Sequence, residues 1–260
     1  MFAESRFAAL FMLVAIAAAL IYLESKTRTG TKLSLRRIPA LDAIDEAVGR
    51  ATEMGGPVHF ACGEGHLTDL WAPMLIAGMS VGRHVAKKTA EVGAKLIWTV
   101  NQSDAVPLIS DIITTEYQLQ DRLDELDISY SLRYLSDNDY AWAAGTWEIF
   151  ESEGVVSNIM AGGFSAMALP MVSVSAQYGH LQVAGTGAIA QLPWFAAVCD
   201  YAIIGEDLFA AGAYLSEDPV LISNIVVQDL VKTFTLIVIV LGLIAGALGM
   251  EVAFSNLFVS

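Results

Sequence analysis

The 260-residue sequence contains few cysteines and has no bias toward glycine or proline. Its two cysteines, Cys62 and Cys199, lie far apart and outside any Cys-x-x-Cys or ligand spacing, which excludes a disulfide scaffold and a zinc site and indicates reduced thiols. The 21 Gly and 7 Pro are close to ordinary usage and follow no repeat period. Collagen-like and low-complexity classes are therefore excluded as well.

Basic residues are also scarce. The chain has 14 Lys and Arg against 28 Asp and Glu, a formal net charge of -14. Residues 38–233 contain 8 basic and 25 acidic side chains, a balance of -17, and after Arg133 the next basic residue is Lys232. Because nucleic-acid affinity depends on a basic surface, we expect no nucleic-acid partner. The same scarcity leaves few side chains to hold a phosphate.

Apolar residues, in contrast, are in excess. They make up 55% of the chain, and the mean hydropathy of +0.55 excludes disorder. Residues 7–23 and 234–250 are uncharged runs of nearly the length of a transmembrane helix, roughly 17–25 residues. A cleaved signal peptide is the alternative for the first run, but Glu4 offsets Arg6 and no small-x-small site follows, which favours an anchor.

Small residues recur at four-residue spacing in both runs, as Ala15 and Ala19 in the first and Gly242 and Gly246 in the second. This spacing indicates either close helix pairing, within one chain or between copies, or ordinary Gly and Ala content.

The basic residues near the first run predict its orientation. Five of them follow it directly: Lys26, Arg28, Lys32, Arg36 and Arg37. The positive-inside rule then places residues 24–233 in the cytoplasm and both termini outside, as a two-pass protein of the cell (inner) membrane. This basic stretch is either a topology signal alone or, in addition, a contact with anionic lipids.

Between the two runs, short apolar segments alternate with helical patterns. We expect strands at 58–62, 95–101, 129–135, 155–161, 181–184 and 201–205, and helices at 38–51, 70–92, 103–125, 139–153, 165–178, 187–199 and from 206 onward. This alternation predicts an α/β fold: a doubly wound, mostly parallel Rossmann-like sheet flanked by N- and C-terminal transmembrane helices.

The corresponding division of the chain is an N-terminal helix at 1–23, a basic tether at 24–37, the Rossmann-like domain at 38–219, a connecting helix at 220–233 and the second span at 234–250. Since no Gly or Pro separates the last two, they can form one continuous helix.

Candidate ligand-binding residues follow the predicted strands, because ligands bind such sheets at the carboxyl ends of the strands. They are Gly63, Gly65, Ser103, Gly163, Ser165, Thr186 and Gly187. Glycine after a strand also permits tight entry into a helix, and this is the alternative interpretation for each one. Gly63-x-Gly65 resembles the start of a dinucleotide fingerprint, but Thr68 replaces the third glycine and Glu64 adds a negative charge.

Catalytic and metal signals are weak, and no catalytic residue is assigned. Glu64, His66 and Asp69 are weak candidates for a metal site, and a histidine that caps a helix is the alternative. Cys62 near His66 permits a nucleophile, whereas a buried free cysteine is the simpler interpretation. The sequence does not indicate which cofactor, if any, the protein binds.

Several short motifs carry a resemblance to a family. They are residues 55–60 (GGPVHF), 62–65 (CGEG), 77–79 (AGM) and 167–170 (MALP). In these the chain resembles an uncharacterised family of prokaryotic membrane-anchored proteins. The resemblance implies an anchored Rossmann-like architecture, but no activity and no functional residues.

Two functions are compatible with the sequence. The first is a non-catalytic, membrane-anchored subunit with a structural or assembly role, whose partners are the lipid bilayer and either further copies of the chain or other subunits of a membrane complex. The alternative is a small-molecule or nucleotide-binding sensor or enzyme that uses the crevice at the strand ends.

Overall fold

The computed structural model describes residues 7–28, 37–216 and 219–247. The chain divides into two compact units, one formed by residues 37–215 and the other by residues 1–36 together with 216–260.

The larger unit is an α/β domain built on one six-stranded sheet. Its strands are β1 (Val58–Gly63), β2 (Leu96–Val100), β3 (Leu132–Tyr134), β4 (Ser157–Gly163), β5 (Leu181–Thr186) and β6 (Tyr201–Ile204). All neighbouring pairs are parallel, and their order is β3-β2-β1-β4-β5-β6. The order reverses between β1 and β4, which makes this a doubly wound sheet with its switch point at that pair.

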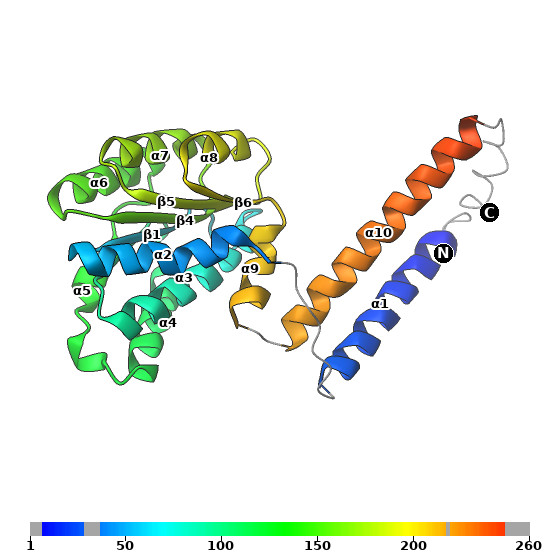
Figure 1. Cartoon of the computed structure of the whole chain (residues 1–260), viewed down its shortest axis with the longest axis horizontal. Helices are drawn as coiled ribbons and strands as arrows, with labels where there is room; N and C mark the ends of the chain where they lie inside the picture. The colour runs from blue at the N-terminus through cyan, green and yellow to red at the C-terminus, as the bar shows by residue number, and fades with distance from the viewer. Residues whose placement is uncertain (1–6, 29–36, 217–218, 248–260) are drawn as a thin grey trace. The chain divides into compact units, whose positions relative to one another are not determined.

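Helices cover both faces of the sheet (Figure 1). One face carries α6 (Asp139–Ser152), α7 (Ala168–Gln177) and α8 (Leu192–Val198), and the other carries α2 (Pro39–Met54), α3 (Ala72–Val92) and α4 (Val106–Leu119). The remaining elements of this unit are α5 (Ile128–Ser131), α9 (Asp207–Ser216) and the short 3-10 turns η1 (Leu123–Glu125) and η2 (Ser165–Met167). The predicted α/β class and mostly parallel sheet are confirmed.

The central strands form the core. Every residue of β1, β2, β4 and β5 is buried, as expected for strands covered on both faces. Trp98 on β2 packs edge to face against Phe60 on β1, with ring centroids 4.6 Å apart. Because both faces are covered, these strands bury the residues of both faces and do not alternate between apolar and exposed polar positions.

The strand expected at 129–135 is only partly correct. The Asp127 carboxylate accepts hydrogen bonds from the backbone N–H groups of Ser129 (3.0 Å) and Tyr130 (3.2 Å). This N-cap stabilises the helical turn α5, so that β3 begins only at Leu132. The helix expected at 103–125 is shorter as well, since α4 ends at Leu119 and Asp121 has a φ of 54°.

The second unit consists of two helices, α1 (Phe7–Arg28) and α10 (Pro219–Ala247), which pack against each other. Within the described residues, one stretch, Ile225–Ile244, is long and apolar enough to cross a bilayer, and in α1 a shorter apolar stretch covers Leu13–Tyr22. The span expected at 234–250 thus begins earlier, and its last residues lie outside the described part of the chain. The connecting helix and this span form one continuous helix, as expected.

Candidate functional site

The predicted ligand-binding residues lie along one edge of the sheet. Ser103 follows β2, Gly63 ends β1, Gly163 ends β4 and Thr186 ends β5, and these four strands are consecutive neighbours in the sheet. The structure therefore brings the candidates to the carboxyl edge, on both sides of the switch point. Gly65, Ser165 and Gly187 lie in the segments that follow these strands.

At the switch point the two central strands approach closely. Gly63 has a φ of 93°, and a Cβ atom there would overlap the backbone carbonyl of Gly163. The N–H of Glu64 donates to that same carbonyl oxygen at 2.7 Å. Glycine at position 63 is thus explained by contact between β1 and β4.

Aromatic side chains occupy the space in front of the other glycines. A Cβ atom at Gly163 would overlap the Trp71 ring, and one at Gly65 would lie 2.6 Å from the Cβ of Trp71. A Cβ at Gly187 would lie 2.9 Å from the Phe209 ring. Side chains of this chain therefore lie where a ligand would approach these backbones.

Backbone N–H groups at this edge are already bonded to side chains. Carboxylate acceptors are Asp69 for His66 N (3.0 Å) and Trp71 N (2.7 Å), Asp104 for Leu67 N (3.1 Å) and Asp137 for Ser103 N (2.9 Å). The bond from Ser103 N lowers the pKa of Asp137. On the other side of the switch point, Gln191 Oε1 accepts from the Phe164 N–H (3.1 Å) and the Thr186 hydroxyl (3.0 Å). Side-chain oxygens, most of them from carboxylates, thus already accept hydrogen bonds from backbone N–H groups of the kind that bind phosphates.

The loop after β1 also differs in geometry from the glycine turn of dinucleotide-binding folds. In such folds the glycine turn leads directly into a helix whose N-terminus faces the pyrophosphate. Here residues 64–71 intervene, and α3 begins only at Ala72. Thr68, at the place of the third glycine, lies in this loop rather than in the helix.

The three residues that are weak candidates for a metal site each interact with a different partner. Asp69 bonds backbone N–H groups, His66 Nδ1 lies 3.4 Å from Asp104 Oδ1, and Glu64 accepts a hydrogen bond from the Ser165 hydroxyl. Within the described residues, no three His, Cys, Asp or Glu side chains are gathered as a metal site.

Cys62 is buried, and burial raises the pKa of its thiol to about 12. Its thiol is therefore neutral at physiological pH, and this favours the interpretation as a buried free cysteine.

Glu64 and Ser165 are bonded to each other at this edge; Glu64 has a shifted pKa and Ser165 has an unusual backbone conformation. Burial raises the pKa of Glu64 to about 8; the hydrogen bond from Ser165 opposes this shift, and the charge of Asp139 adds to it. Ser165 has a φ of 36°, a left-handed conformation that is strained for a residue with a side chain. Strain and a shifted pKa at a switch point are features of functional sites.

A chain of buried polar groups crosses the sheet, and the sequence analysis did not identify it. His59 on β1 lies between Thr99 on β2 (Nε2 to Oγ1, 2.9 Å) and Asn158 on β4 (Nδ1 to Oδ1, 2.7 Å). Asn158 Nδ2 donates to Ser175 Oγ (3.0 Å), and Ser175 Oγ lies 3.0 Å from His180 Nδ1. A polar side chain at one position of each of three strands was the available signal.

From Thr99 to Ser175, each group in this polar network donates its hydrogen bond to the next one. Since the Asn158 amide nitrogen faces Ser175, its oxygen faces His59, whose Nδ1 must then carry the proton and donate. Nε2 of His59 accepts from the Thr99 hydroxyl. Burial lowers the pKa of His59 to about 4, against the opposing bond to Asn158 and with a smaller contribution from His180. His59 is therefore neutral and fully bonded.

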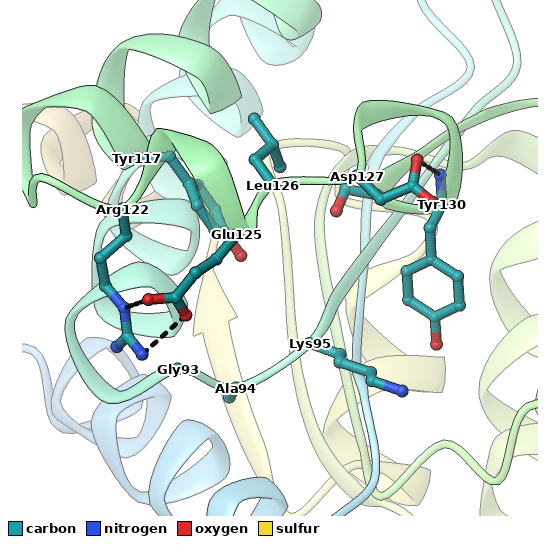
Figure 2. Close-up of a pocket in the computed structure, with 10 residues that line it drawn as sticks. Gly93, Ala94, Lys95, Tyr117, Arg122, Glu125, Leu126, Asp127 and Tyr130 are labelled. Carbon is teal, nitrogen blue, oxygen red and sulfur yellow. Dashed lines mark hydrogen bonds and ion pairs between the residues drawn. The ribbon is translucent and has the colours of Figure 1, made fainter.

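Two cavities lie at the opposite, amino edge of the sheet. One of about 500 Å³ is lined by His180 and Tyr178 and adjoins the end of the polar chain. The other, of about 350 Å³, lies between the end of α3 and the start of α5 (Figure 2). In it Arg122 bonds Glu125 through two nitrogens, at 2.9 and 2.8 Å, and also donates to the Ala90 carbonyl at 3.0 Å. Arg122 thereby caps the last turn of α3, which is a structural role.

The fold and this edge define a doubly wound α/β domain whose switch point is acidic and bonded to its own side chains. The chain belongs to the family described as a domain of unknown function, DUF6754, whose model matches residues 1–258. Comparison with curated proteins and with solved structures gives no match.

Proposed function

We propose that the chain is a membrane-anchored, non-catalytic α/β subunit with a structural or assembly role. The observation that carries the proposal is the state of the switch-point edge, where Asp69, Asp137 and Gln191 accept the backbone N–H groups that would bind an anionic cofactor. Trp71 lies against Gly163 at the same place. A domain whose ligand crevice is occupied by its own side chains is better suited to a structural role than to catalysis on a nucleotide.

Membrane anchoring is supported by α10. At 1.5 Å per residue, its 29 residues extend over about 44 Å, more than the roughly 30 Å hydrocarbon core of a bilayer. Large apolar side chains such as Phe234, Leu236 and Leu243 are exposed along it. We propose that α1 crosses the membrane beside it, with both termini outside and the α/β domain in the cytoplasm.

An assembly role is supported by exposed apolar side chains on the loops of the carboxyl edge. Leu70 in the loop after β1 is 95% exposed, and Ile189 in the loop after β5 is 83% exposed. Large apolar residues exposed at one edge are typical of protein interaction surfaces. We propose that this edge contacts a second copy of the chain.

The oligomeric state of the full chain in mild detergent tests this proposal. Native mass spectrometry is expected to show oligomers, and the double variant Leu70→Ser with Ile189→Ser is expected to shift them toward monomers. Met54→Ser with Leu119→Ser is the matched control, because these side chains are also exposed but lie at the opposite end of the sheet. A wild-type chain that is monomeric at every concentration would contradict the assembly role.

The second candidate is a sensor or enzyme that binds a small molecule at the strand ends. The strained Ser165 and its bond to the perturbed Glu64 favour it. A thermal-shift screen of the full chain against nucleotides, flavins and nicotinamides separates the two candidates. Stabilisation that is lost in Gly65→Val, where the new side chain would displace Trp71, would favour the second candidate.

A further inference from the structure

Two buried oxygen atoms at the switch-point edge have no donor in the described part of the chain. The first is Oδ1 of Asn101, a fully buried residue directly after β2. The second is Oε1 of Glu64. Buried acceptors without a donor are unfavourable and are rare in native proteins, so each calls for an explanation.

The orientation of Asn101 is fixed by its neighbour. Its Nδ2 donates to Oδ1 of Asp139 at 2.8 Å, and the reverse orientation would place two acceptors against each other. Asp139 begins α6 and lies close enough to Glu64 for its charge to raise the pKa of that carboxyl group. Asn101 is thus bonded through its amide nitrogen to a carboxylate whose charge reaches Glu64, and its amide oxygen is left without a donor.

The hydroxyl of Ser165 completes this group of oxygen atoms. It donates to Oε2 of Glu64 and has lone pairs left to give. The four side chains come from different segments: Glu64 follows β1, Asn101 follows β2, Ser165 follows β4 and Asp139 begins α6. Because β1, β2 and β4 are adjacent in the sheet, these segments lie at the same edge, where Ser165 bonds Glu64, Asp139 acts on Glu64 through its charge, and Asn101 bonds Asp139.

The charge of the surrounding segments has one sign. Residues 64–71, 101–105, 135–139 and 164–167 contain five carboxylate residues and neither Lys nor Arg. The acidic residues are Glu64, Asp69, Asp104, Asp137 and Asp139. These segments have no basic side chain that could neutralise the negative charge, so they would attract a positively charged ligand.

We propose that Glu64, Asp139, Asn101 and Ser165 bind a divalent cation of the oxygen-preferring class, Ca²⁺ or Mg²⁺. Two carboxylates, one amide oxygen and one hydroxyl are ligands suited to these ions, and waters complete their coordination. The cation gives Asn101 Oδ1 and Glu64 Oε1 the partner they lack, and Ser165 keeps its bond to Glu64 while it coordinates. This site does not depend on the proposed assembly role.

Isothermal titration of the full chain in detergent with CaCl₂ and with MgCl₂ tests the site. One cation is expected to bind per chain, and the melting temperature is expected to rise by about 5 °C at a cation concentration 100-fold above Kd.

Variants separate this site from general attraction to an acidic surface. Glu64→Gln and Asp139→Asn are each expected to weaken binding at least tenfold. Asp111→Asn, which removes an exposed carboxylate on α4, is the matched control and is expected to leave Kd within about twofold.

Ser165→Gly keeps the test valid if the charge variants fail to fold, because glycine accepts the left-handed backbone and the substitution removes the hydroxymethyl group without changing the charge. It is expected to fold and to weaken binding. The proposal would be overturned if neither cation binds at millimolar concentration and 10-fold molar excess. It would also be overturned if Glu64→Gln, Asp139→Asn and Ser165→Gly all leave binding unchanged.

Discussion

Acid is expected to destabilise the α/β domain through His59. This side chain is fully buried, and both of its ring nitrogens are engaged, with Nδ1 donating to Asn158 and Nε2 accepting from Thr99. Protonation would place a charge in the middle of the sheet and would turn Nε2 from an acceptor into a donor that faces a hydroxyl group. The unfolded chain has no such penalty.

The sign and size of the effect follow from the pKa of His59. The folded state lowers this pKa from 6.5 to about 4, so that between these values the unfolded chain binds a proton that the folded chain refuses. The stabilisation is fully present above pH 6.5 and is lost as the pH falls toward 4. At 1.36 kcal/mol per pKa unit, the loss between pH 7.5 and pH 4 is about 3 kcal/mol.

Comparison with His59→Gln isolates this effect from the titration of the many carboxylates. Urea unfolding of the full chain in detergent, followed by tryptophan fluorescence, gives the free energy of unfolding at each pH. The difference between wild type and His59→Gln is expected to shrink by about 3 kcal/mol from pH 7.5 to pH 4. Parallel pH profiles for wild type and His59→Gln would refute the reasoning.

Three further predictions concern the carboxyl edge and the apolar helix α10. Gly163→Ala is expected to lower the free energy of unfolding by about 1–3 kcal/mol, measured by urea unfolding, because its Cβ would overlap Trp71; Gly49→Ala, with open space around it, should not. Folding raises the pKa of Glu64 from 4.5 to about 8, so its contribution to stability is fully present below pH 4.5 and is lost as the pH rises through 8. Between pH 7 and pH 9 the melting temperature of wild type should therefore fall more than that of Glu64→Gln. Ile239→Arg is expected to reduce insertion of α10 in a glycosylation-reporter assay by about 2.5–3.5 kcal/mol, whereas Ile239→Leu should insert normally.

The sequence predicts the fold class well because buried parallel strands are mostly apolar. Residues 58–62 and 96–100 are such segments, and the helices between the strands are long enough to read from their periodicity. Strand order was not predictable, since it depends on which face each helix covers. The error at 129–135 has a local cause, because the capping carboxylate of Asp127 stabilises a helical turn in a segment with strand-like composition.

The edge that carries the site was predictable, but its contents were not. Parallel strands end on the same side, so Gly63, Gly163 and Thr186 had to lie on one edge. The position of Trp71 over Gly163 could not be read from the sequence, because it depends on the path of an irregular loop. The bond between Asn101 and Asp139 joins residues 38 positions apart, and the sequence alone does not reveal such a pair.

The two outer strands restrict how copies of the domain can join. β3 has three residues and β6 has four, so each outer edge presents very few unpaired backbone N–H and C=O groups to a neighbour. Short outer strands of this kind protect a sheet against extension by another chain. Copies of the α/β domain are therefore expected to meet, if at all, through side chains on loops and helices, and the domain is expected to resist fibrous aggregation even at high concentration.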